Sequence, residues 1–98
     1  MLLTEEERKL ARHALGFARG RVESYRNYFV TDRAGTDGAI WMGMVEKGAA
    51  TVQAGNAMTG GDDLFRLTYA GATAATDPGE KLHWEPLQPR GLAGKAGA

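Results

Sequence analysis

The chain has 98 residues, enough for one domain, and its 43% hydrophobic and 24% charged residues are typical of a globular protein. It contains no cysteine, which excludes a disulfide framework, a thiolate zinc site and a cysteine nucleophile. The formal net charge is zero, and the excess of basic residues in the first third is small. This charge balance counts against a strong binder of duplex DNA, because such proteins neutralise many phosphates.

Neither a signal peptide nor a membrane span is predicted. The opening ten residues, MLLTEEERKL, place only two leucines before a run of charged side chains, so they lack the apolar core of a signal peptide. No later run approaches the roughly 20 apolar residues that a membrane span requires. We therefore expect a soluble, cytoplasmic protein.

An amphipathic helix is predicted over residues 5–15, because Thr4 and Glu7 form a T-x-x-E capping box and apolar residues recur on one face. Gly16 is well placed to end this helix, and a second helix is predicted over residues 21–29. Drawn as one continuous helix instead, the segment aligns four arginines opposite the apolar face: Arg8, Arg12, Arg19 and Arg26. Such a face tracks phosphates, docks on an acidic protein surface, or is simply solvated.

A third helix is predicted over residues 37–47, where a compact apolar stripe includes Trp41 and Met44. Tyr25, Tyr28 and Phe29 fit a small core with Trp41, although aromatic side chains also stack on bases or anchor protein partners.

A β-hairpin with a long loop is predicted next. AATVQA at residues 49–54 and LFRLT at 64–68 are the two strands, and the turn-forming residues of GNAMTGGDD connect them. Thr68 is suited to cap a short helix that runs through Ala75.

From Asp77 onward the chain is rich in proline and glycine, which predicts an irregular and finally disordered tail. We therefore divide the sequence into a domain at residues 1–76 and a tail at residues 77–98. Trp84 lies in the tail, where a large aromatic side chain either packs against the domain or marks an interface with a partner.

The predicted order of helices and hairpin resembles a winged helix, and the residues that carry the resemblance are MVEKG at 44–48 and FRLTYAG at 65–71. The resemblance implies a small α+β domain with three helices, a two-stranded β-hairpin and a short C-terminal helix. RHALG, YRNYFV, MVEKG and GGDDLFRLTYAG are also similar to segments of a group of small, largely uncharacterised phage and prophage proteins.

No catalytic, metal or cofactor site is predicted. His13 and His83 are the two histidines, and neither is accompanied by further residues at zinc-ligand or catalytic spacing. Gly55, Gly60 and Gly61 lack the lysine and hydroxyl residue of a phosphate-binding loop. The acidic pair of GGDD lacks the spaced ligands of a calcium loop, so a hairpin turn explains it better.

The leading functional hypothesis is a noncatalytic phage or prophage accessory protein that binds a host or phage protein and modulates or inhibits a nucleic-acid-processing complex. The partner-binding candidates are charged or aromatic residues outside the predicted core: Arg8, Arg12, Arg19, Arg26, Asp62, Asp63, Arg66 and Trp84. The alternative is a winged-helix transcription regulator that binds DNA as a homodimer. TDGAIWMGMVEK, the would-be recognition helix, argues against it because it offers little beyond Lys47 to contact base edges. A minor virion or assembly component is a third hypothesis.

Overall fold

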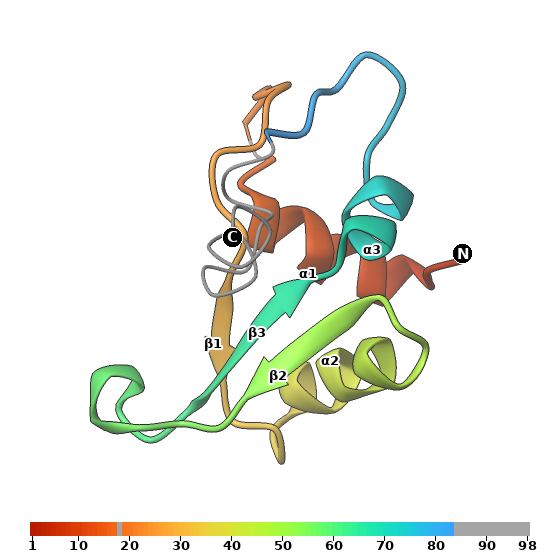
Figure 1. Cartoon of the computed structure of the whole chain (residues 1–98). Helices are drawn as coiled ribbons and strands as arrows, with labels where there is room; N and C mark the ends of the chain where they lie inside the picture. The colour runs from red at the N-terminus through yellow and green to blue at the C-terminus, as the bar shows by residue number, and fades with distance from the viewer. Residues whose placement is uncertain (18, 84–98) are drawn as a thin grey trace, which may run out of the picture.

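The computed structural model describes residues 1–17 and 19–83, which form a small α+β fold. Three α-helices pack with a three-stranded antiparallel sheet in the order β1-β3-β2 (Figure 1). The elements in chain order are α1 (Glu5–Leu15), β1 (Phe29–Thr31), α2 (Thr36–Glu46), β2 (Ala50–Gln53), the 3₁₀ turn η1 (Ala57–Thr59), β3 (Asp63–Leu67) and α3 (Tyr69–Ala74). The α+β class is therefore confirmed.

Helix α1 has the predicted bounds and the predicted cap. The Glu7 amide donates to Thr4 Oγ1 at 3.1 Å, and the Thr4 amide donates to Glu7 Oε1 at 2.9 Å, so both halves of the capping box are present. At the other end, Gly16 takes a left-handed conformation with φ 87°, which glycine adopts without strain. Local sequence signals were sufficient for this element.

The hairpin and the helix after it also follow the prediction. Strands β2 and β3 pair from Ala50 opposite Leu67 to Gln53 opposite Leu64, and the long loop between them projects away from the helices (Figure 1). Thr68 Oγ1 accepts from the Gly71 amide at 3.1 Å and so caps α3. Helix α2 begins and ends one residue earlier than the predicted range of 37–47.

The predicted second helix over residues 21–29 is wrong. The chain there is largely extended and leads into β1, which was not predicted and which adds a third strand by pairing with β3. The Tyr25 amide donates to Leu15 O at 3.1 Å and the Tyr28 amide to Ala14 O at 3.3 Å, so the backbone bonds run to α1 rather than along a helix. Tertiary contacts have overridden the helical periodicity.

Asn27 fixes the extended segment to the sheet. Its side-chain amide donates to Leu67 O at 3.0 Å, and its side-chain oxygen accepts from the Leu67 amide at 2.9 Å. The residue is only 3% exposed, so both bonds are made away from water, where an unpaired polar group would be costly. The side chain therefore occupies the place of a neighbouring strand residue beside β3.

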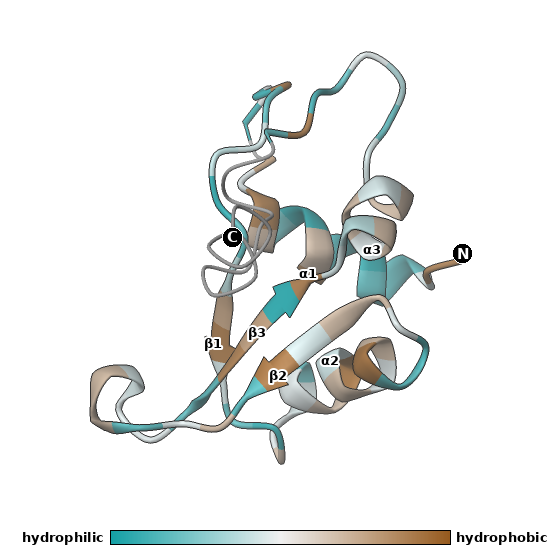
Figure 2. Cartoon of the chain, in the orientation of Figure 1, coloured by the Kyte–Doolittle hydropathy of each residue, from teal (hydrophilic) through white to brown (hydrophobic). Residues whose placement is uncertain are grey.

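The core lies between the helices and one face of the sheet. Trp41 of α2 stacks on Phe65 of β3, and its ring centre lies 5.5 Å from that of Phe65 and 5.5 Å from that of Phe29. Figure 2 shows hydrophobic residues gathered on β1 and β3. Tyr25 and Tyr28 do not join this core, because they are 52% and 50% exposed, so their predicted packing role is wrong.

The first part of the predicted tail lies against the domain. Residues 77–83 contain no helix or strand beyond one isolated parallel bridge between Lys81 and Glu23. The Lys81 amide donates to Val22 O at 2.8 Å, and the Ser24 amide donates to Lys81 O at 2.9 Å. Leu82 packs on the core, whereas Trp84 and the rest of the tail lie outside the described residues. Among the helices of the described ranges, none has the length and apolar character to cross a membrane.

Candidate docking surface

The segment between α1 and β1 exposes arginine and tyrosine side chains side by side. We call Arg19, Arg21, Tyr25, Arg26 and Tyr28 the arginine–tyrosine surface. The Arg21 guanidinium carbon lies 4.5 Å from the centre of the Tyr25 ring, and that of Arg26 lies 5.2 Å from Tyr25 and 5.8 Å from Tyr28. These cation–π contacts make the four residues continuous on the surface.

Tyr25 is held in place by the end of α1. Its backbone amide is bonded to Leu15 O, and its ring lies so close to Gly16 that a Cβ there would come within 2.1 Å of the ring carbon Cε1. Gly16 therefore both ends α1 and gives the ring a place to lie. Tyr25 as a whole is 52% exposed.

Arg26 is also positioned by α1. Its Nη2 and Nε atoms donate to His13 O at 2.7 and 3.2 Å. A cation at this point complements the negative end of the helix dipole and satisfies a carbonyl of the last turn. The contact fixes the guanidinium between Tyr25 and Tyr28.

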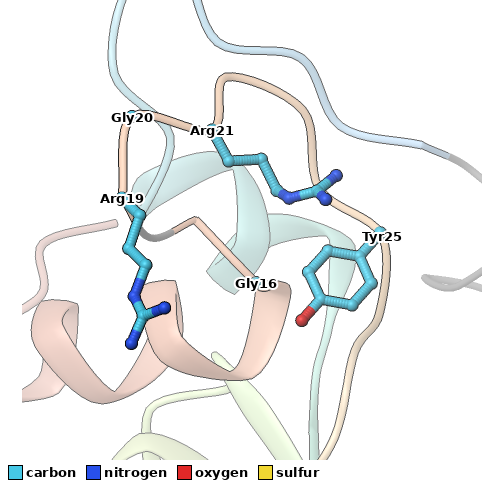
Figure 3. A pocket seen from close by; sticks show the side chains of 5 residues that line it. All are labelled: Gly16, Arg19, Gly20, Arg21 and Tyr25. Carbon is cyan, nitrogen blue, oxygen red and sulfur yellow. The ribbon is translucent and has the colours of Figure 1, made fainter.

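Two hollows open on this surface. The larger, of about 540 Å³, is lined by Gly16, Arg19, Gly20, Arg21 and Tyr25. Figure 3 shows the side chains of Arg19 and Arg21 leaving the loop on either side of Gly20, with the Tyr25 ring beside Gly16.

The smaller hollow has a volume of about 170 Å³ and shares no lining residue with the first, but its Arg26 contacts the Tyr25 ring that lines the first. It is lined by His13, Arg26, Tyr28, Phe29 and Val30. It therefore reaches from the end of α1 to strand β1, which forms one edge of the sheet.

The arginines of this surface form no ion pair within residues 1–17 and 19–83, although Arg21 lies near enough to Glu23 to help lower the pKa of the Glu23 carboxyl. Arg19, Arg21 and Arg26 form no ion pair there, whereas Arg8, Arg12, Arg33 and Lys47 each pair with a carboxylate. The acid within the same segment, Glu23, pairs instead with His83, whose hydrogen bond at 3.0 Å lowers the pKa of the Glu23 carboxyl. Arg19, Arg21 and Arg26 therefore carry positive charge that no ion pair of the described residues neutralises.

Arg8 and Arg12, which were predicted to bind a partner, are engaged within the fold. Arg12 makes a bidentate contact with Glu80, with both N–O distances 2.6 Å, and also donates to Ala75 O at 2.9 Å. The hydrogen bond from Arg12 lowers the pKa of the Glu80 carboxyl to about 2. Arg8 pairs with Asp77, so both arginines fasten residues 75–80 to α1.

The two predicted acids of the hairpin loop differ in role. Asp63 accepts from Arg33 Nε at 2.8 Å and from the Gly55 amide at 3.1 Å, and these hydrogen bonds, that from Arg33 above all, lower its pKa to about 2. Its carboxylate is buried and closes the base of the loop. Asp62 is partly exposed, and its side chain has no partner within the described residues.

The remaining predicted site residues are not brought together with the arginine–tyrosine surface. Arg66 lies on β3 opposite Thr51, with its side chain partly exposed. Trp84 falls outside the described residues. Of the predicted set, Arg19 and Arg26 belong to the surface. The single helical stripe of four arginines is wrong, because α1 ends at Leu15.

Arg21, Tyr25 and Tyr28 were missed as site residues. The signal that could have found them is RVESYRNY at residues 21–28, in which arginine and tyrosine alternate. The stretch follows Gly20 directly and Gly16 closely, and both glycines disfavour a helix. Extended backbone after such a break exposes these side chains instead of burying them.

In the described part of the chain, no group of three or more histidine, aspartate or glutamate side chains could hold a metal ion. Comparison of the whole chain with protein-family models, with curated proteins and with solved structures gave no match. The chemistry that the arginine–tyrosine surface offers is charge-assisted hydrogen bonding combined with aromatic contact.

Proposed function

We propose that this chain is a noncatalytic accessory protein of a phage or prophage. It acts in the host cytoplasm, where it binds a host or phage protein of a nucleic-acid-processing complex and modulates or inhibits that complex. The observation that carries the proposal is the arginine–tyrosine surface, where Arg21 and Arg26 contact two half-exposed tyrosines and Arg19 lines the hollow beside Tyr25. These three arginines form no ion pair in the described chain. The phage or prophage setting is part of the proposal and comes from the expected resemblance of RHALG, YRNYFV, MVEKG and GGDDLFRLTYAG to such proteins.

The composition of the surface favours a protein partner. Tyrosine and arginine are enriched where proteins meet, because both combine a broad contact area with hydrogen bonding. Val22 and Val30, in the same stretch of chain, are 56% and 40% exposed. A protein would cover these aliphatic side chains while its carboxylates meet the arginines in the two-pronged geometry that guanidinium groups prefer.

The proposal is tested by affinity capture from nuclease-treated host lysate. We expect the wild-type chain to retain a protein partner that remains after nuclease treatment. A chain with Arg21→Ala and Tyr28→Ala should lose it, because these changes remove a guanidinium and a ring without touching the core. A matched chain with Lys9→Ala and Met58→Ala removes a cation and an exposed apolar side chain from outside the surface and should keep the partner.

The result that contradicts the proposal is equally specific. Capture that is the same for both double variants would show that the arginine–tyrosine surface is not the interface. Capture that disappears on nuclease treatment would show that a nucleic acid, rather than a protein, is what the chain binds.

A winged-helix DNA regulator is the second candidate, favoured by the position of α2 directly before a hairpin whose loop projects from the body (Figure 1). The exposed residues of α2 are Thr36, Asp37, Ala39 and Glu46, and none of them is an arginine, lysine, asparagine or glutamine. Lys47 Nζ, next to the helix end, bonds to Glu7 Oε1 at 2.7 Å. Because base edges in the major groove are read mainly by the residue types that α2 lacks, we rank this candidate second.

Salt dependence separates the two candidates. Each phosphate that an arginine neutralises contributes about −0.9 to the slope of log affinity against log salt concentration. Duplex DNA bound through the three arginines of the surface would therefore give a slope of about −3. Fluorescence anisotropy with labelled duplexes of several sequences measures this slope. Tight, sequence-selective binding would favour the DNA regulator over the protein-binding function.

A further inference from the structure

We infer that the larger hollow, between Arg19, Arg21 and Tyr25, is an anion-binding pocket that receives the carboxylates of an acidic segment of the partner protein. The inference rests on the proposed function and deepens it by naming the chemistry of the partner. It also assigns to Arg19 the role of the main affinity-determining residue of the pocket.

The pocket is basic on two sides and aromatic on a third. Arg19 and Arg21 both line it (Figure 3). Within residues 1–17 and 19–83 neither forms an ion pair, and the acid nearest to Arg21, Glu23, is paired with His83. Arg21 is steadied by its contact with the Tyr25 ring, which is itself held by Leu15 and Gly16. An arginine that is already ordered loses less conformational entropy when it binds a carboxylate.

The glycines keep the space open. Gly20 has φ 80°, and a Cβ built there would meet nothing within 4 Å, so this side of the rim is free of other atoms of the described chain. The hollow is open to solvent and, at about 540 Å³, has room for more than one carboxylate. A peptide segment with two neighbouring acidic side chains fits a hollow of this size with two arginines on its walls.

The backbone at Arg19 is a second, independent observation. Its φ of 55° is left-handed, and Arg19 is the non-glycine residue with positive φ in the described chain. Glycine or asparagine adopts this conformation with less strain, and the exposed Arg19 side chain makes no ion pair there that would offset it. An arginine kept at a strained, exposed position on the rim of a basic pocket is explained by what it binds.

A protein carboxylate is favoured over a nucleic-acid phosphate by the apolar surroundings. Val22 follows Arg21 directly and is more than half exposed. A peptide side chain next to the acidic residues would cover Val22, whereas a phosphodiester backbone would leave it in water. The zero net charge of the chain also gives little long-range attraction for a polyanion.

The test is an NMR titration of the ¹⁵N-labelled full chain with a blocked Glu-Glu dipeptide, using the blocked Gln-Gln dipeptide as the uncharged control. We expect saturable shifts in the amides of Gly16, Gly20, Arg21 and Tyr25 with the first peptide and not with the second. Arg19→Gly should weaken the affinity for the Glu-Glu dipeptide by about tenfold, the loss expected for one charge-assisted hydrogen-bonding group. Its thermal midpoint should be equal to or above that of the wild type, because the strained residue is gone.

Two further variants refine the result. Arg19→Lys keeps the charge but loses the planar fork, so it should bind with intermediate affinity. Lys9→Ala, which removes a cation from α1, should bind as the wild type does. Loss of binding without loss of stability in Arg19→Gly is the outcome that a merely structural role would not produce.

Three outcomes overturn the inference. If the Glu-Glu dipeptide causes no saturable shift, or shifts residues away from the pocket, the hollow is not a carboxylate site. If a single-stranded thymidine oligonucleotide moves the same amides and the dipeptide does not, the occupant is a nucleic acid. If the dipeptide does not bind while capture from lysate still depends on Arg21 and Tyr28, the assignment of the hollow as a carboxylate site is wrong. The proposed protein-binding function then stands.

Discussion

Two adjacent aspartates of the hairpin show how far a single residue's role depends on its surroundings. Asp63 is buried and accepts from Arg33 and the Gly55 amide, whereas the Asp62 side chain is partly exposed and has no partner in the described chain. We predict that Asp63→Asn lowers the urea concentration at the midpoint of unfolding at pH 7. The neutral amide loses the charge that strengthens the hydrogen bonds from Arg33, and its NH₂ group cannot accept one. Asp62→Asn, the matched control, should leave the midpoint unchanged.

The sequence could not separate these two residues. GGDD gives both the same local context, and the difference arises from Arg33, which lies 30 positions before Asp63. Equal effects of the two substitutions would mean that the Arg33 contact adds nothing to stability, as happens for many exposed ion pairs.

At the scale of the elements, two glycines of α2 predict opposite responses to the same substitution. A Cβ at Gly38 would lie 2.0 Å from Asp32 O, whereas a Cβ at Gly43 would lie 3.6 Å from its nearest neighbour, Glu7 Oε2. We expect Gly38→Ala to destabilise the fold by about 2–4 kcal/mol through a backbone clash. Gly43→Ala should raise stability by up to about 1 kcal/mol through helix propensity.

Chemical denaturation of the two variants measures this contrast. A shared helix makes them a matched pair, since any general effect of alanine on α2 appears in both. If Gly38→Ala proved as stable as the wild type, the turn at Asp32 would have to move away from the helix at little cost. The close approach of the loop to α2 would then be unimportant for the fold.

The segment after α3 depends on Arg12 in the same way that the hairpin depends on Arg33. Arg12 bonds to both carboxylate oxygens of Glu80 and to Ala75 O. We predict that Arg12→Ala speeds hydrogen exchange of the Lys81 amide, which is bonded to Val22 O, by about tenfold or more. Lys9→Ala on the same helix should leave it unchanged, and equal exchange in both variants would mean that the backbone bonds alone hold the segment.

The elements that sequence analysis predicted are those with local signals. The Thr4 capping box, the Thr68 cap and the turn-rich hairpin loop each specify structure within a few residues, and all three are present. The prediction of a helix over residues 21–29 failed because their apolar spacing permits a helix. The hydrogen bonds that decide their conformation run instead to Leu15, Ala14 and Leu67. Non-local pairing of this kind leaves no periodic trace in one sequence.

Sequence analysis found only part of the candidate surface, because the backbone path of residues 19–28 depends on the same non-local contacts. Arg19 and Arg26 were chosen from a helical projection that the fold does not contain, and they remain candidates on different grounds. Their neighbours Tyr25 and Tyr28 were assigned to the core because their spacing with other apolar residues suits a small core. Half-exposed aromatics beside unpaired arginines are recognisable only once the backbone path is known.

At the scale of the whole molecule, ion pairs sort the charges into structural and free ones. The net charge is zero, and Arg8, Arg12, Arg33 and Lys47 form ion pairs with carboxylates of the fold. Within residues 1–17 and 19–83, Arg19, Arg21 and Arg26 form none. A neutral chain can therefore present a positive docking surface. The same pairing makes the stability of the fold depend on its carboxylates remaining ionised.

We predict that the fold is progressively destabilised as the pH falls from about 5 to about 2. The pKa of Asp63 and that of Glu80 are each lowered to about 2 by the arginines they contact, below their ordinary values of 3.8 and 4.5. In this range the unfolded chain binds more protons than the folded one, so stability is fully present above the ordinary values and is lost toward pH 2. Burial raises the pKa of Glu7, but its bonds with Lys47 and Thr4 outweigh that effect and lower it overall, so Glu7 acts in the same direction.

Urea unfolding at pH 7, 5, 4 and 3 measures this dependence. The double variant with Asp63→Asn and Glu80→Gln provides the control, because amides do not titrate in this range. It should start less stable at pH 7 and lose less stability on acidification than the wild type. Parallel curves for the two proteins would contradict the prediction, since the acid sensitivity would then come from general charge repulsion rather than from the two arginine-bound carboxylates.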